Sequence, residues 1–217
     1  MSEGYSILVD TSKCTACRGC QISCKQWNGL PGTHTKNEGT HENPLDLSAD
    51  TWKIVRFSEG LSKDGNPFWH FFSEQCRHCL SPGCMAEAEN GEIIQDEKTG
   101  AVIYTPKTKD LNYQATRDAC PYDIPRQDPK TKQLFKCTMC FDRITNNMIP
   151  ACVKSCPTGA MQFGDRPKVL EMVKARVEEL SRKFPKAKAI NPEDVRVIYI
   201  VNDDPQKYWR LLPSPGY

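Results

Sequence analysis

Twelve cysteines fall into four groups along the 217-residue chain, and their spacing is the clearest chemical signal in the sequence. The first group is Cys14-x2-Cys17-x2-Cys20-x3-Cys24. The second is Cys76-x2-Cys79-x4-Cys84, and the third is Cys120 followed by Pro121. The fourth is Cys137-x2-Cys140-x11-Cys152-x3-Cys156, followed by Pro157. Thiols at such short intervals are typical of metal ligands or of a disulfide framework.

Three kinds of chemistry could use this pattern. Disulfides fit it poorly, because cysteines three residues apart on a tight loop seldom pair with each other. Structural zinc uses Cys-x2-Cys pairs, but it does not need a third cysteine at x2 and a fourth at x3. Iron–sulfur ligation explains both, because the x2, x2 spacing wraps one loop around a cubane and the x3 step carries the fourth thiolate to a second cluster. The sequence therefore predicts [4Fe-4S] clusters, with zinc and disulfides as weaker alternatives.

The four motifs resemble those of the iron–sulfur subunits that accompany molybdopterin oxidoreductases, such as formate dehydrogenase, dimethyl sulfoxide reductase and nitrate reductase. Such subunits have two ferredoxin-like halves and, typically, four clusters. The first three cysteines of a motif hold one cluster, and the fourth completes the cluster of a partner motif. Motif one partners motif four, and motif two partners motif three. The resemblance spans about residues 5–165.

The resemblance implies three sets of four ligands, which together use all twelve cysteines. The first cluster is expected on Cys14, Cys17, Cys20 and Cys156. The second is expected on Cys24, Cys137, Cys140 and Cys152. The third is expected on Cys76, Cys79, Cys84 and Cys120.

The chain departs from the family pattern at a single cluster. Ala88 stands where motif two should have its fourth cysteine, and Glu89 replaces the proline after it. Motif three has Asp110, Tyr113 and Thr116 at the positions of its first three cysteines. All four missing ligands belong to one cluster, so we expect three [4Fe-4S] clusters instead of four.

The missing cluster and the end of the chain point to the same kind of enzyme. In membrane-bound relatives, that cluster lies toward a membrane cytochrome subunit, and a C-terminal transmembrane helix follows. Residues 209–217 are too short and polar for such a helix, and no apolar run approaches the ~20 residues that span a bilayer. The chain most resembles the small (beta) subunit of the soluble tungsten- or molybdenum-containing formate dehydrogenases of sulfate reducers.

This resemblance implies a role in electron transfer. We expect the chain to form a heterodimer with a large catalytic subunit that holds a tungsten or molybdenum bis-pterin and its own proximal iron–sulfur cluster. Electrons would pass between that subunit and an external acceptor such as a soluble cytochrome c, and the chain itself would have no catalytic site. Two alternatives stay open: the same role beside another molybdopterin oxidoreductase, and a free-standing polyferredoxin.

The N-terminus shows no export signal, with neither an apolar h-region nor a twin-Arg pair. Soluble relatives of this kind are carried across the membrane by a signal on the catalytic partner. We therefore expect a periplasmic location through co-export, with a cytoplasmic location as the alternative.

The rest of the sequence predicts an α+β fold: two interleaved bacterial-ferredoxin-like halves with loop insertions and a C-terminal helix–strand extension. Residues 1–28 with 134–165 should form the half that holds two clusters, 51–133 the half that holds one, and 166–217 the extension. Alternation and turn residues predict strands over 6–9, 52–57 and 195–201, a helix over 21–27, a hairpin of 92–95 with 101–104, and a loop over 28–50. Asp165 should cap a helix that has Pro167 in its first turn and ends near Lys183.

Three polar residues near the cysteines allow two interpretations each. His78 could donate a hydrogen bond to a cluster sulfur or lie at the surface of its loop. Lys136 and Lys154 flank cluster cysteines and could offset cluster charge or be solvated. Tryptophans 27, 52 and 69 are expected to pack in the core or at an interface.

Composition and motifs argue against other functions. Basic and acidic residues number 29 and 27 and are spread along the chain, so no basic patch predicts nucleic-acid binding. Three bound cubanes would change the net charge from +2 to about −4, so the apoprotein charge says little about partners. Neither a phosphate-binding glycine motif nor a nucleophile elbow is present, which argues against nucleotide binding and hydrolysis.

Overall fold

The structure is a computed structural model and describes residues 3–213. Its centre is a four-stranded sheet in the order β8–β1–β10–β9. Strand β1 (Tyr5–Asp10) pairs antiparallel with β8 (Met161–Asp165) and parallel with β10 (Val197–Val201), which pairs antiparallel with β9 (Lys188–Ile190). All five residues of β10 are buried, as expected for a continuous β-branched and aromatic run in a central strand.

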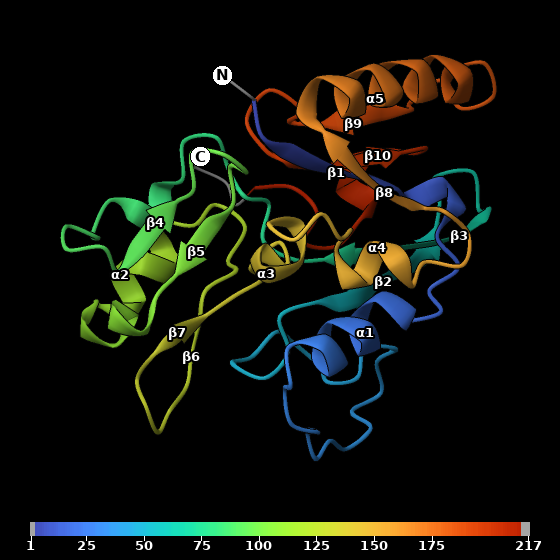
Figure 1. The fold of residues 1–217 in the computed structure, drawn as a ribbon. Helices are drawn as coiled ribbons and strands as arrows, with labels where there is room; N and C mark the ends of the chain where they lie inside the picture. The colour runs from blue at the N-terminus through green and yellow to red at the C-terminus, as the bar shows by residue number, and fades with distance from the viewer. Residues whose placement is uncertain (1–2, 214–217) are drawn as a thin grey trace.

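Each face of this sheet is covered by different elements, as Figure 1 shows. Helix α5 (Arg166–Ser181) lies on one face, where its Val169 and Val173 share a cluster with Leu8 and Ile198. The alternate residues of the same strands face the other side and pack with the segments that carry the cysteines. The sheet therefore fixes the position of the cysteine loops on its second face.

Short helices follow the cysteines on that face. Helix α1 (Gly19–Trp27) carries Cys20 and Cys24 of the first motif, and α3 (Phe141–Ile144) and α4 (Ala151–Lys154) lie within the fourth. Helices α1 and α4 run side by side below the sheet in Figure 1, joined by a hydrogen bond between the Ser23 and Ser155 hydroxyls. Motifs at opposite ends of the sequence thus form one unit.

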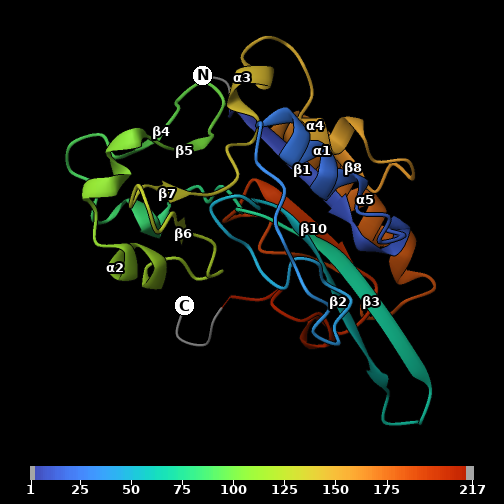
Figure 2. The same cartoon turned by 90° about the horizontal axis from the view of Figure 1, so that it is seen from below.

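A long ribbon and a separate small lobe complete the fold. Strands β2 (Ile54–Leu61) and β3 (Pro67–Glu74) form an antiparallel ribbon whose tip extends beyond the rest of the chain in Figure 2. The lobe contains hairpin β4 (Ile93–Gln95) with β5 (Val102–Tyr104), helix α2 (Tyr113–Asp118) and hairpin β6 (Arg126–Gln127) with β7 (Leu134–Phe135). Single 3-10 turns span Thr11–Lys13 (η1), Gly83–Met85 (η2), Pro106–Asp110 (η3) and Pro205–Lys207 (η4).

The mixture of helices and sheets confirms the α+β prediction, and most expected elements are present within about two residues. The strand expected at 52–57 begins at Ile54 and continues to Leu61 because it pairs with β3, which the sequence had not indicated. Asp165 precedes α5 as expected but makes no capping hydrogen bond; its carboxylate instead pairs with Lys168 at 3.1 Å.

The expected division into two halves and an extension stays a prediction. The central sheet joins strands of the first predicted half (β1, β8) with strands of the extension (β9, β10). The ends of these expected units, residues 1–2 and 214–217, lie outside the described residues. Within residues 3–213, no helix is long and apolar enough to cross a membrane.

The loop expected at 28–50 lacks helix and strand but is held to the core at Asp46. The carboxylate of Asp46 contacts the guanidinium groups of Arg56, Arg126 and Arg210. Burial acts to raise the pKa of Asp46, but the hydrogen bond from Arg56 and the charges of the other two arginines lower it to about 2. The loop is therefore fastened near its end by an ionised carboxylate.

Candidate iron–sulfur cluster sites

Three of the four Cys-x2-Cys pairs, those that begin at Cys14, Cys76 and Cys137, share one local geometry although they lie far apart in sequence. In each pair, the residue two positions after the first cysteine has a positive φ: 54° at Ala16, 48° at His78 and 59° at Met139. The backbone N–H of His78 donates to Cys76 Sγ at 3.3 Å, and that of Met139 donates to Cys137 Sγ at 3.4 Å. Burial raises the pKa of Cys14, and a hydrogen bond from the Ala16 N–H offsets part of the rise. Left-handed turns that direct N–H groups at sulfur make a nest for an anionic ligand.

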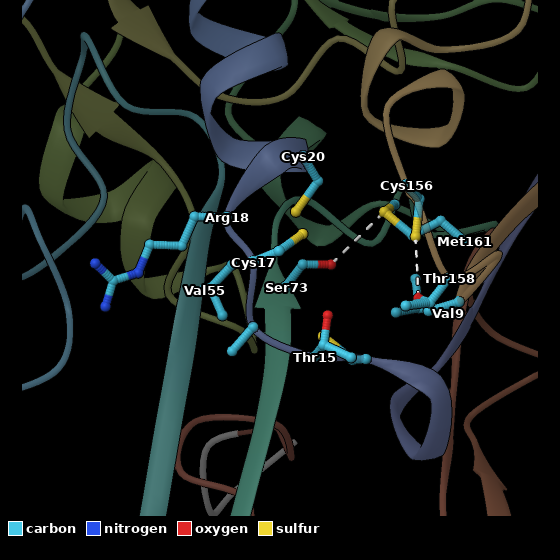
Figure 3. Close-up of a pocket in the computed structure, with 13 residues that line it drawn as sticks. Val9, Thr15, Cys17, Arg18, Cys20, Val55, Ser73, Cys156, Thr158 and Met161 are labelled. Carbon is cyan, nitrogen blue, oxygen red and sulfur yellow. Dashed lines mark hydrogen bonds between the residues drawn. The ribbon is translucent and has the colours of Figure 1, made fainter.

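The first site lies between the first motif and the end of the fourth. Cys14, Cys17, Cys20 and Cys156 line a small cavity together with Val9 and Val55 from strands β1 and β2. In Figure 3 the sulfurs of Cys17, Cys20 and Cys156 face a common space, whereas the side chain of Arg18 points away from it. These are the four cysteines that the resemblance assigns to the first cluster.

The third site is a similar small cavity in the lobe. It is lined by Cys76, Cys79, Cys84 and Cys120, with Tyr104 and Lys136 among its other walls. Cys84 and Cys120 are brought together by the residues before them, because a Cβ on Gly83 would lie 2.7 Å from the carbonyl oxygen of Ala119. Only a glycine permits this approach of the two backbones.

The second site is the most enclosed. Cys24, Cys137, Cys140 and Cys152 are all buried, whereas each of the other two sites has cysteines that reach the surface. Burial, followed by the charges of the other three cysteines, raises the pKa of Cys24 well above its usual range. The four thiols are therefore neighbours, from helix α1 and from both parts of the fourth motif.

The electrostatic neighbours of individual cysteines also give the order of the sites. Cys20 of the first site lies near Cys152 of the second, whose charge raises its pKa. Cys137 of the second site lies near Cys76 of the third in the same way. The sites thus form a row, with the second in the middle.

The thiols have the properties of ligands that need a metal centre to ionise. Burial raises the pKa of Cys20 and Cys140 to about 11 and that of Cys79, Cys120 and Cys137 to about 12, with neighbouring cysteines adding to the rise. Coordination by iron would remove these protons, since a bound metal deprotonates a thiol outright.

The donor set also fits cubane clusters in its spacing. All twelve cysteines are free thiols. Within residues 3–213, no three His, Cys, Asp or Glu side chains converge closely enough to ligate one metal ion directly. The thiols instead stand around cavities, as ligands must if a four-iron, four-sulfide core lies between them.

The Tyr104 hydroxyl supports this fit at the third site. It is buried beside Cys84 and has no hydrogen-bond partner of normal geometry among residues 3–213. Burial raises the pKa of Cys84, and the charge of Lys136 and this hydroxyl offset part of the rise. A buried hydroxyl without a partner is costly. A cluster sulfur in the adjoining cavity would supply the missing acceptor.

His78 contacts the site through its backbone N–H, and its ring nitrogen Nε2 is buried without a hydrogen-bond partner among residues 3–213. The side chain is fully buried, so the surface interpretation is wrong. Its Nδ1 accepts a hydrogen bond from the Val102 N–H at 3.0 Å, and the backbone N–H makes the bond to Cys76 Sγ. Burial, with Lys136 and Arg196 nearby, lowers the pKa of His78 well below its usual range, so the ring is neutral.

The two flanking lysines differ. Lys136 is buried and lines the third cavity, whereas Lys154 is exposed. A third lysine, Lys53, is buried immediately before β2, which was not expected from the sequence. Its signal was a lysine inside an alternating stretch that otherwise predicts a half-buried strand.

The tryptophans expected to pack in the core or at an interface lie near the surface. Trp52 is half-buried and stacks on Phe135, whereas Trp27 is 42% exposed and Trp69 is 57% exposed.

Apolar packing occupies the place of the missing cluster ligands. Ala88 packs with Met85, Leu111, Ile93 and Val102 in a small core of the lobe. The other three replaced positions lie on η3 and α2, a helix capped by the Asn112 side chain instead of a cluster-binding loop. Thr116 is buried there, and its hydroxyl donates to the Asn112 carbonyl at 2.9 Å.

Comparisons with known proteins agree with this geometry. A family model described as a 4Fe-4S dicluster domain matches residues 67–166. The formate dehydrogenase subunit beta of Megalodesulfovibrio gigas is 50% identical over 96% of this chain and 97% of its own length. The formate dehydrogenase 2 subunit beta (cytochrome c-553) of Nitratidesulfovibrio vulgaris is 47% identical over 94% of this chain and 96% of its own length. The nitrate-inducible formate dehydrogenase iron–sulfur subunit of Escherichia coli is 35% identical over 96% of this chain and 72% of its own length.

The fold is ferredoxin-like, and its cysteines lie on left-handed turns whose N–H groups point at sulfur. These features define the class of protein: an iron–sulfur protein that transfers electrons. More closely, the chain belongs to the family of formate dehydrogenase iron–sulfur (beta) subunits. Its role is therefore that of a non-catalytic electron-transfer subunit of an oxidoreductase.

Proposed function

We propose that the chain holds three [4Fe-4S] clusters on its twelve cysteines and relays electrons between the catalytic subunit of a formate dehydrogenase and an external acceptor. The observation that carries the proposal is the exposure of the three sites in their row. The middle site has four buried cysteines, whereas Cys17 of the first site is exposed and Cys79 of the third is half-buried. A relay needs accessible ends and an insulated middle, because partners must approach the terminal clusters closely.

The first site is the proposed contact with the catalytic subunit. Arg18, which lines this cavity, stacks over Phe57 at 5.2 Å. Trp69, 57% exposed, and His41 lie against the same ring. Exposed aromatic and arginine side chains are enriched in protein interfaces, so this group supports docking beside the first site.

The third site is the proposed exit. An open groove of about 860 Å³ adjoins it, lined by Cys79 and Tyr122 and by the acidic pair Glu193 and Asp194. Acidic residues beside an exit cluster would favour an acceptor with a basic face. One relative carries cytochrome c-553 in its name, and we propose a soluble cytochrome c for this chain as well.

The packing around Ala88 supports the proposed count of three clusters. The fourth cluster of the resembling family has no thiol ligands here, and its surroundings are filled by Leu111 and Met85. Iron and acid-labile sulfide analysis of the isolated chain tests the count, with about twelve of each expected. The heterodimer, whose catalytic subunit would add a cluster of its own, should contain about sixteen. A value near sixteen in the isolated chain, or zinc in place of iron, would overturn the ligand assignment.

The partner and the compartment form part of the same proposal. We propose a heterodimer with the pterin-containing catalytic subunit and a periplasmic location reached by co-export with it. Purification through a tag on this chain should recover a large subunit that oxidises formate. Fractionation of cells should place both subunits in the periplasm, and recovery of the assembled complex in the cytoplasm would contradict the location alone.

The replacement Cys120→Ala tests the direction of the relay. It should remove the third cluster, stop cytochrome c reduction by formate, and leave formate-dependent reduction of a small dye at the catalytic subunit. Cluster signals from the first two sites should persist. Loss of a first-site signal in this variant would refute the ligand pairing.

A further inference from the structure

Two lysines are buried in the interior without a carboxylate partner. Lys53 is 2% exposed and Lys136 is 4% exposed. Lys53 donates to the side-chain carbonyl of Gln75, and Lys136 Nζ donates to the carbonyl oxygens of Val102 at 2.5 Å and Cys137 at 3.1 Å. Within residues 3–213, neither ammonium has an Asp or Glu within ion-pair distance. An unpaired buried charge is costly, so both positions call for a nearby anion.

Lys53 lies between the first and second sites. It precedes β2, whose Val55 lines the first cavity. Burial raises the pKa of Cys20 in the first site and of Cys24 in the second, and the charge of Lys53 offsets part of the rise in both. In turn, the charges that act most strongly on Lys53 belong to cysteines of these two sites, Cys152 and Cys20.

Lys136 lies between the second and third sites. It directly precedes Cys137 of the second site and donates to its carbonyl oxygen. Its side chain lines the third cavity, where its charge lowers the pKa of Cys84. Its Nζ is also 4.7 Å from the centre of the Tyr104 ring, on the wall of the same cavity.

We propose that Lys53 and Lys136 are counter-charges built into the two junctions of the cluster row, each shared by the clusters on either side. A cubane with four thiolates is a dianion when oxidised and gains a further negative charge when reduced. Between buried neighbours this added charge is strongly repelled. A fixed ammonium at each junction stabilises the reduced state of both adjacent clusters and weakens the repulsion between them, so that neighbouring clusters hold electrons at the same time.

The chain provides a matched control in Lys154. This lysine lies between Cys152 and Cys156, ligands proposed for the second and first clusters, but its side chain is exposed. Water and salt screen an exposed charge far more than a buried one. A comparison of Lys53 with Lys154 therefore separates the effect of a buried positive charge from the effect of a lysine that is only close to cysteines in the sequence.

The test is a potentiometric titration of the purified complex followed by EPR, with iron content measured on each variant. Lys53→Met should lower the ratio of reduced to oxidised first and second clusters at a fixed potential by at least tenfold, equivalent to 59 mV for one electron, and leave the third unchanged. Lys136→Met should shift the second and third clusters and leave the first unchanged. Lys53→Arg should keep wild-type potentials. Lys154→Met should change the ratio of reduced to oxidised cluster by less than twofold at every site.

Several outcomes would overturn the proposal. The first is a Lys53→Met variant with full iron content and unchanged cluster potentials. The second is a shift of cluster potential in Lys154→Met or in Lys53→Arg as large as the shift in Lys53→Met. If Lys53→Met loses iron while Lys53→Arg retains it, the need for charge is supported; loss from both variants would show a role in shape and contradict it. The inference rests on the proposed ligand sets, which iron analysis of the unaltered complex tests separately.

Discussion

The hydroxyls of Ser23 and Ser155 lie 2.8 Å apart and join helix α1 to the end of helix α4. Each serine directly precedes a cysteine whose proposed cluster is held mainly by the other motif, Cys24 in one case and Cys156 in the other. The bond therefore connects the two places where the first and fourth motifs exchange ligands. The first and fourth motifs, which pair as in ferredoxins, are thus joined directly by the hydrogen bond between Ser23 and Ser155.

We expect Ser23→Ala and Ser155→Ala each to weaken this unit by about 1 kcal/mol, the usual net contribution of one hydrogen bond. That corresponds to a fall of about 2–4 °C in the temperature at which cluster absorbance is lost on heating. In the double variant, this temperature should be no lower than in the less stable of the two single variants. Ser181→Ala, at the end of α5, is the control; additive losses in the double variant would contradict a direct bond.

Gly83→Ala should loosen the third site alone. The new Cβ would lie 2.7 Å from the Ala119 carbonyl oxygen, so the segments that carry Cys84 and Cys120 must separate. Such overpacking costs about 1–3 kcal/mol. After brief treatment with an iron chelator, the variant should retain about eight iron atoms per chain where the wild type retains about twelve. Gly32→Ala, at a position with open space around it, should behave as wild type.

Tyr104→Phe should lower the potential of the third cluster and leave the other two unchanged. The buried hydroxyl beside Cys84 would donate to cluster sulfur, a bond that strengthens as the cluster gains negative charge. A difference of about 1 kcal/mol between the two redox states corresponds to about 40 mV. Tyr113→Phe is the control in the same lobe, since that hydroxyl already accepts from Arg117 at 3.1 Å. A shift at all three clusters would contradict the local effect.

Asp46→Asn should destabilise the chain by about 1–2 kcal/mol, because the loop loses charged contacts to Arg56, Arg126 and Arg210. The pKa of Asp46 is about 2 in the folded chain, below the usual value of 3.8. Its contribution is therefore complete above about pH 4 and is lost only as the pH falls toward 2. The difference in thermal stability between wild type and variant should stay constant from pH 8 to pH 6; a difference that shrinks within this range would contradict the assignment.

Much of the fold could be predicted because its signals are local. The alternating and β-branched runs predicted β1, β4, β5 and β10, and the apolar spacing after Pro167 predicted α5. Strand β3 was missed, since its aromatic run forms a strand through pairing with β2. The place of β10 in the same sheet as β1 depends on parallel pairing between the ends of the chain, which local patterns do not encode.

The cysteine spacing by itself determined the chemistry of this protein, because ligand spacing is a property of short loops. The spacing also showed that one family cluster lacks its ligands, at Ala88 and at the three positions before Cys120. Only the tertiary structure decided the order of the sites, the burial of the middle one, and the identity of the charges between them. Lys136 and Lys154 are alike in sequence as basic residues that flank cysteines, yet one is buried between two sites and the other is exposed. Burial and long-range electrostatics depend on what the folded chain places around a residue, and that is settled only when distant segments pack together.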